Sequence, residues 1–186
     1  MSSPPHRSQE LAGGGEWKHL RKWREKLEQK MPKIDIANAK TEIYTGYPDP
    51  YRDAVAGRER KRLGNAAGLD QFGVNLTRLK PGMQSSQRHW HETEDEFVYV
   101  IEGEVVLCEN GGETVLRPGE AAGWKAGVAN GHCVVKRTNR DAVYLEIGTR
   151  KKDDRVEYPD IDLINTKADG AQRFFHKSGE PYPPRQ

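Results

Sequence analysis

The chain has 186 residues, of which 34% are apolar and 31% are charged, and its formal net charge is +2. This length suits one domain with room for tails, and the near balance of charge does not call for a nucleic-acid partner. No apolar run approaches the roughly 18 residues that a membrane span needs, and the N-terminus lacks the apolar core of a secretory signal. We therefore expect no membrane partner and a cytoplasmic protein, in which Cys108 and Cys133 are small buried thiols.

Residues 1–30 are expected to form a disordered arm followed by a short helix. Residues 1–15 are rich in Ser, Pro and Gly, which is typical of disorder. From residue 16 to residue 30, apolar residues recur every three or four positions, which predicts an amphipathic helix; they are Trp17, Leu20, Trp23 and Leu27. We expect this helix to pack on the domain or on a partner, although contact with nucleic acid or a membrane is open to it. Translation can start at Met1 or at Met31.

Residues 31–69 form an irregular lead-in, punctuated by Pro and Gly. The lead-in contains a basic cluster, Arg58 to Arg62, with the sequence RERKR. Two interpretations remain open for this cluster. It is either a phosphate-binding patch or a solvated loop or short helix, and the second is the expected one.

Residues 70–150 form a train of short strands separated by turns. The run FGVNLTRL (72–79) alternates, FVYVIEG and EVVLCE flank Gly103, Asn110-Gly111 is a hairpin signal, and the run AVYLEIGT (142–149) follows. Many strands with hardly any helical period predict an all-β fold, an antiparallel sandwich or barrel. Residues 151–186 turn polar and Pro-rich, which predicts a C-terminal arm that lies over the domain.

The sequence RHWHETEDEF contains the candidate metal ligands. On a strand, His89 and His91 project to the same side, and imidazole is a common metal ligand. Glu96 opens the next strand on the same face as two valines, where burial of its carboxylate costs free energy unless a cation meets it. His132, at the start of a later apolar strand, is the fourth candidate.

These residues resemble the first motif of the cupin superfamily, in the form Gly82-(x)6-His89-x-His91-(x)4-Glu96-(x)6-Gly103. The spacing between Gly82 and His89 is one residue longer than usual. The resemblance covers residues 70–150 and implies a small antiparallel β-barrel, a jelly roll, which is often a homodimer. The wider sequence also looks like small bacterial single-domain cupins that carry loose labels such as sugar-phosphate isomerase-like or regulator-like.

The second cupin motif departs from its usual pattern. Gly119 is followed after five residues by Lys125-Ala126-Gly127, where the family has proline in place of Lys125. His132 comes two residues late, and strict spacing would put Asn130 in the ligand position. We favour His132 because imidazole binds metal better than an amide, and Asn130 is the alternative. Lys136 takes the place of the motif's asparagine.

A site of three imidazoles and one carboxylate would hold one divalent ion, Fe, Mn, Zn or Ni, and leave positions for a small-molecule substrate. Such an ion polarises a carbonyl or, as Fe(II), binds dioxygen, so both sugar-type isomerase and dioxygenase chemistry are open on a small polar or anionic substrate. A non-catalytic ligand-binding or sensing cupin is the alternative, and the single helix of residues 16–30 favours the enzyme because a DNA-binding helix-turn-helix needs a second helix.

Four further residues are candidates around the metal. The catalytic candidates are Lys136, which alternation places on the face of His132, and Glu146, whose structural alternative is an ion pair with Arg78 or Arg150. Arg88 is a candidate for binding an anionic substrate, and Trp124 either lines the mouth of the site or packs the core.

Overall fold

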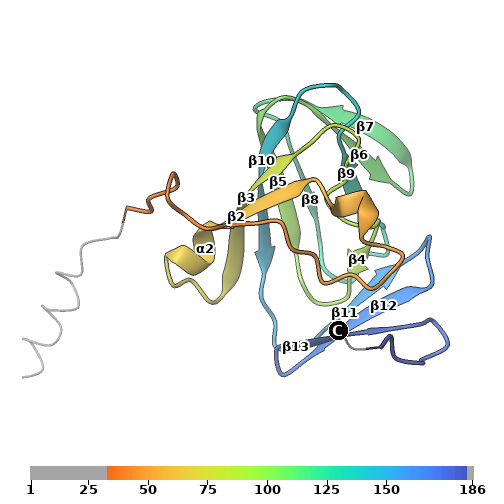
Figure 1. Cartoon of the computed structure of the whole chain (residues 1–186). Coiled ribbons are helices and arrows are strands. Elements are labelled where there is room, and N and C mark those ends of the chain that lie inside the picture. Colours follow the sequence, from red (N-terminus) through yellow and green to blue (C-terminus); the bar gives the residue numbers. More distant parts are fainter. Residues whose placement is uncertain (1–32, 184–186) are drawn as a thin grey trace, which may run out of the picture. The chain divides into compact units, whose positions relative to one another are not determined.

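The computed structural model describes residues 33–183 (Figure 1). The chain divides into two units after Lys33, and the described residues belong almost entirely to the second unit, 34–186. The arm and the amphipathic helix expected for residues 1–30 lie outside the described residues. Within the described part, the architecture is the expected all-β one, since its only α-helix is α2 (Leu63–Ala66) and its only 3-10 helix is η1 (Asp53–Val55).

The largest sheet is six-stranded and antiparallel, in the order β1-β2-β3-β10-β5-β8. Its strands are β1 (Thr41–Glu42), β2 (Arg58–Arg62), β3 (Phe72–Leu79), β5 (Glu96–Glu102), β8 (Ala121–Trp124) and β10 (Ala142–Thr149). The predicted runs at β3 and β10 are confirmed residue for residue. On β10, Ala142 and Tyr144 are fully buried and face Leu79 and Thr77 of β3, as the period of two requires.

Two smaller antiparallel sheets complete the unit, in the orders β7-β6-β9 and β13-β12-β11-β4. Their strands are β4 (Trp90–His91), β6 (Val105–Glu109), β7 (Gly112–Leu116), β9 (Cys133–Val135), β11 (Asp154–Tyr158), β12 (Leu163–Ala168) and β13 (Ala171–Phe175). Figure 1 shows β6, β7 and β9 at the upper right and β11 and β12 at the lower right. Single bridges from Gln84 to Val135 and from His89 to His132 connect the two sheets, so segment 84–91 runs from one to the other.

Two clusters of buried side chains form the core. The first lies between the six-stranded and three-stranded sheets and consists of Leu79, Val98, Val100, Val105, Leu107, Leu116, Val134, Ala142 and Tyr144. The second involves the C-terminal sheet and consists of Tyr47, Val55, Val156, Tyr158 and Leu163. Both cysteines are free thiols, Cys133 is buried, and burial raises its pKa to about 12.

Gly103, the last glycine of the first motif, shows why that motif requires glycine. Its φ is +71°, a value that side-chain-bearing residues rarely adopt, and a Cβ there would lie 2.5 Å from the backbone oxygen of Asp141. Gly103 therefore allows the chain to leave β5 and enter β6 close to the start of β10.

The structure differs from expectation in the lead-in and in the C-terminal segment. The basic cluster is neither a loop nor a short helix but strand β2, paired with β3. Residues 151–186, expected as an arm over the domain, contain three strands, and β11 pairs with β4 at His91. Neither segment was predicted as strand because both are polar, without the alternation of apolar residues that marks a strand with one buried face.

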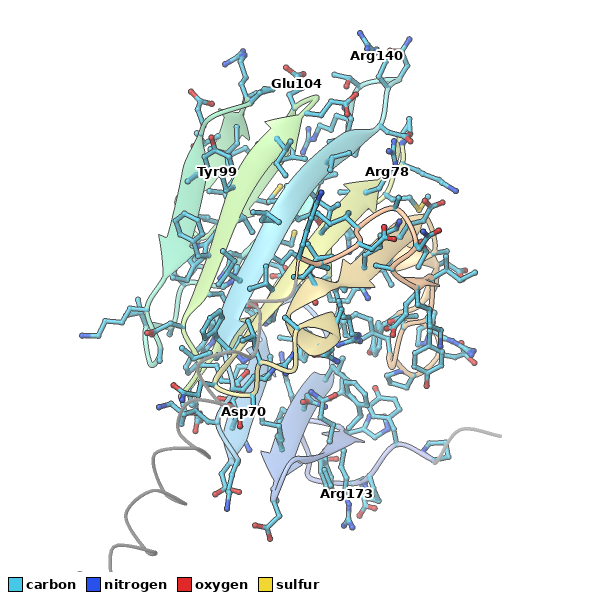
Figure 2. All side chains as sticks on the ribbon, turned by 90° about the vertical axis from the view of Figure 1, so that its left-hand side faces the viewer. Asp70, Arg78, Tyr99, Glu104, Arg140 and Arg173 are labelled. Carbon is cyan, nitrogen blue, oxygen red and sulfur yellow. The ribbon has the colours of Figure 1, made fainter. Side chains whose placement is uncertain are left out.

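The outer face of the six-stranded sheet carries exposed apolar side chains. Figure 2 views this sheet face-on, with Tyr99 and Arg78 on either side of β10. Phe97, Tyr99 and Ile101 of β5 are between 39% and 45% exposed, so Tyr99 points away from the barrel interior. The homodimer that the resemblance implies stays a prediction. In residues 33–183, no helix has the length and apolar character needed to cross a membrane.

Candidate metal centre

Backbone pairing brings the predicted ligands together. His89 and His132 form an antiparallel bridge, with N–H···O distances of 3.1 and 2.9 Å in the two directions. His91 follows on β4, two residues from His89 and on the same face. Glu96 opens β5, where Val98 and Val100 continue its face into the buried core. Three separate segments of the chain thus deliver four side chains to one point.

The three imidazoles converge on one carboxylate oxygen. The Nε2 atoms of His89 and His91 both lie 3.5 Å from Oε2 of Glu96, and Nε2 of His132 lies 2.8 Å from the same atom. The ligand atoms of His89, His91 and Glu96 lie within 4.8 Å of one another, so these three residues form a group that could hold a metal ion.

The opposite ring nitrogen of each histidine is held by an oxygen that only accepts. The Nδ1–H group of His89 donates to the backbone carbonyl of Gln87 (2.9 Å), and that of His132 donates to the backbone carbonyl of Asn130 (3.0 Å). The Nδ1–H group of His91 donates to the carboxylate of Asp154 (2.6 Å). In the neutral imidazole, the proton therefore sits on Nδ1 and the lone pair on Nε2. Outer partners of this kind orient metal-binding histidines, so the donor set fits a divalent ion.

The electrostatics of the site favour an ionised carboxylate beside the imidazoles. Burial alone would raise the pKa of Glu96, but when the imidazoles are also protonated on Nε2, the charges of His89 and His91 and the hydrogen bonds from His132 and His89 hold this pKa well below its usual range. Burial would lower the pKa of His91, yet the hydrogen bond that His91 donates to Asp154 and the charge of Glu96 raise it. The pKa of Asp154 is lowered despite burial, because His91 and Thr93 donate to its carboxylate.

The structure distinguishes the two candidates for the fourth position. The Asn130 side chain points to other partners, since its amide nitrogen donates to Glu109 (2.7 Å) and its amide oxygen accepts from the backbone of Asn110 (3.1 Å). The His132 imidazole is 6% exposed and stacks on Trp124 with a centroid distance of 3.8 Å. Trp124 also donates to Glu109 (2.8 Å), so it fixes the plane of the imidazole as well as lining the site.

The site opens into a cavity of about 800 Å³ that is lined largely by polar side chains. Glu146 lines this cavity and pairs with Arg60 (2.6 Å), not with Arg78 or Arg150 as the sequence suggested. The hydroxyl of Tyr144 donates to the same carboxylate (3.2 Å). Glu146 of β10 lies directly opposite Val98 of β5. Val98 is two residues from Glu96, so the positions of Glu146 and Glu96 are offset by about 7 Å along the strands.

Two predicted site residues do not line this cavity. Arg88 alternates with His89 and turns to the other face, where its guanidinium binds Asp160 (Nε–Oδ2 2.7 Å) and Asn110. Lys136 is buried at 1% exposure, as alternation predicted, but its ammonium contacts Thr138. The structure does not favour the substrate contact predicted for Arg88 or the catalytic contact predicted for Lys136, because Arg88 points to the opposite face of its segment and Lys136 is bonded to Thr138.

The sequence missed several residues of the site. Asp154 stands in the polar run KKDDR, 63 residues from His91, and no local signal distinguishes it from its neighbours. Glu94 was not among the predicted site residues, yet its side chain is only 14% exposed and lines the cavity in contact with Lys167. For Arg58 and Arg60 the sequence did contain a signal: they belong to the basic cluster RERKR, for which a phosphate-binding patch was one of the two interpretations.

Asp154→Asn is expected to weaken metal binding by roughly 10- to 100-fold, the usual cost of losing an outer-shell partner. The asparagine amide cannot hold the Nδ1 proton of His91 with a charge-assisted bond, so the imidazole loses both orientation and basicity. Asp162→Asn is the matched control, because Asp162 binds His176 in the same way (2.7 Å) on the surface. Competition with a chromophoric chelator measures both affinities, and equal values in the two variants would contradict this role of Asp154.

The chain resembles known proteins over most of its length. A family profile described as a cupin domain matches residues 75–148. A solved structure of a sugar phosphate isomerase from the cupin superfamily of Silicibacter pomeroyi is 42% identical, with a TM-score of 0.79, and the match covers 82% of this chain and 97% of that one. A proposed sugar phosphate isomerase from Acidithiobacillus ferrooxidans is 28% identical, with a TM-score of 0.62, over 70% and 84% of the two chains. The polyketide cyclase RemF from Streptomyces resistomycificus, at 22% identity, a TM-score of 0.54 and coverage of 65% and 80%, shares the fold alone. No curated protein matches the chain.

Proposed function

Because the chain belongs to the cupin superfamily and is related to sugar phosphate isomerases, we propose that it is a metal-dependent isomerase of a small phosphorylated sugar. The observation that carries this proposal is the convergence of three imidazole Nε2 atoms on Glu96, inside a cavity that also presents the carboxylate of Glu146. His89, His91, Glu96 and His132 would hold the ion. A divalent ion bound there would polarise the carbonyl of the substrate and acidify the adjacent C–H bond.

The proton transfer is assigned to Glu146. Interconversion of an aldose and a ketose removes a proton from the carbon next to the carbonyl and returns it to the neighbouring carbon, so it needs one group that both accepts and donates. Glu146 lines the same cavity as the metal ligands, and Arg60 and Tyr144 fix the direction of its carboxylate. With Lys136 bonded to Thr138 outside the cavity lining, Glu146 is the better of the two catalytic candidates.

An isomerase assay in deuterated water tests the function. The protein is stripped with a chelator, reloaded separately with Mn, Fe, Zn or Ni, and incubated with a panel of aldose and ketose phosphates. We expect interconversion with at least one ion, deuterium at the carbon next to the carbonyl, and loss of both on chelation. Oxygen consumption with Fe(II) would instead identify a dioxygenase, and saturable sugar binding without turnover under any ion would identify a non-catalytic binding protein.

A further inference from the structure

Strand β2 presents a row of arginines to the cavity. In the sequence RERKR, alternation places Arg58, Arg60 and Arg62 on one face of the strand, and all three line the cavity. Glu59, between them, faces the other way and pairs with Lys80 (2.6 Å). The strand lacks apolar alternation because its inner face borders a polar cavity and not the hydrophobic core.

Among these arginines, Arg58 is the one without a carboxylate partner in the described part of the chain. Arg60 pairs with Glu146 and Arg62 with Glu42, each at 2.6 Å. Arg58 is only 9% exposed, and its guanidinium donates to the backbone carbonyl of Ser85. Burial, and next the like charge of Arg60, lower the pKa of Arg58, so a negative group at this position would be favoured.

Three buried side-chain atoms on β2 and β3 lack a hydrogen-bond partner within residues 33–183: Nε of Arg60, Oδ1 of Asn75 and the hydroxyl oxygen of Thr77. Nε of Arg60 can only donate, and Oδ1 of Asn75 can only accept. Asn75 lies directly opposite Arg62 in the β2–β3 register and lines the cavity. A ligand that carries both an oxyanion and a hydroxyl group has the acceptor that Nε of Arg60 lacks and the donor that Oδ1 of Asn75 lacks.

This arginine face adjoins the metal centre through two consecutive residues. Arg58 binds the carbonyl of Ser85, and the hydroxyl of Ser86 lies 3.2 Å from Nδ1 of His89. Ser85 is itself fixed, because its hydroxyl accepts from the backbone N–H of Val134 (3.0 Å). A ligand held at Arg58 would therefore extend along the cavity towards the converged histidines.

We propose that Arg58 and Arg60 form an oxyanion subsite that binds the phosphate group of the substrate, with Asn75 accepting a hydroxyl of the same molecule. Guanidinium groups bind oxyanions through two parallel N–H donors, and a phosphate has enough terminal oxygens to serve two guanidinium groups at once. Naming the phosphate as part of a sugar substrate rests on the proposed function, whereas anion binding by Arg58 does not.

Calorimetric titration of the full chain with inorganic phosphate tests the subsite. The titration is run on the protein as purified and again after chelation, because binding that survives chelation does not involve the metal. We expect phosphate to bind in both states and Arg58→Met to weaken binding at least tenfold in both. Arg78→Met is the matched control, since Arg78 lies opposite Glu59 on the outer face of the same sheet and pairs with Asp141; its phosphate affinity should equal that of the parent.

Three results would overturn the subsite. They are no phosphate binding after chelation, equal phosphate binding by Arg58→Met and the parent, and equal affinity for acetate and phosphate, which would point to a carboxylate ligand.

If Arg58→Met does not fold, as judged by circular dichroism, Arg58→Lys provides the test. Lysine keeps the charge but loses the bidentate geometry of the guanidinium, so this variant should still weaken phosphate binding several-fold. Phosphate binding without isomerase turnover would keep the subsite and reject the proposed function. Isomerase turnover with an unchanged KM in Arg58→Met would keep the proposed function and reject the subsite.

Discussion

Replacing His91 with alanine is expected to remove most of the bound metal. The variant loses one of three converging imidazoles and also leaves the carboxylate of Asp154 buried without its imidazole partner. The affinity should therefore fall by more than the roughly 10- to 100-fold that loss of an outer partner costs. Elemental analysis after dialysis against a defined free metal concentration measures the effect.

A second readout comes from thermal unfolding of the same variant. A ligand at 100 times its Kd stabilises the native state by about 2.7 kcal/mol, so added metal should raise the Tm of the parent and leave that of His91→Ala almost unchanged. His176→Ala is the control, because His176 makes the same Nδ1 contact to a carboxylate but lies on the surface. If His91→Ala purifies with as much metal as the parent, the ligand assignment fails.

Replacing Glu146 with glutamine is expected to lower kcat by roughly 10²- to 10⁴-fold, which is the usual contribution of a general acid–base group. Glutamine has nearly the same shape and can still accept from Arg60, but it cannot take up the substrate proton. Metal content should not change, because Glu146 is not one of the proposed ligands: it lies on the neighbouring strand opposite Val98, two residues from Glu96.

Glu59→Gln provides the control for Glu146→Gln. Its carboxylate forms an ion pair of the same length, 2.6 Å, but on the outer face of β2. Its kcat should match that of the parent. A Glu146→Gln protein with normal kcat and a raised KM would show that Glu146 binds substrate and does not transfer the proton.

The sequence predicted the parts of the molecule where one face of a strand is apolar. Short strand-like runs located β3 and β10, and alternation placed Glu96 on the buried face of β5. The pair His89 and His91 stood out because residues two apart on a strand share a side. The same rule, applied to Arg88, would have placed it on the opposite face from the histidines.

The rest depended on information that a local pattern does not contain. The strand character of β2 is masked because its inner face is cationic, so the run RERKR reads as a solvated segment. Asp154 reaches His91 only because β11 pairs with β4, a contact between residues 63 apart in sequence. For Lys136, alternation predicted burial correctly, but its hydrogen-bond partner depends on how the chain continues past β9.

The position of Asp154 on β11 links ion binding to protection against proteolysis. The recognisable cupin profile ends at residue 148, yet the strand that orients His91 begins at Asp154. Lys151 and Lys152, exposed between β10 and β11, offer trypsin a cleavage site. Pairing of β11 with β4 holds Asp154 against His91 and so strengthens metal binding, which means that metal binding and attachment of the C-terminal sheet stabilise each other by reciprocal linkage. A fragment trimmed to the profile would lose this coupling, and the metal-loaded protein should be digested at the Lys151-Lys152 junction more slowly than the stripped one.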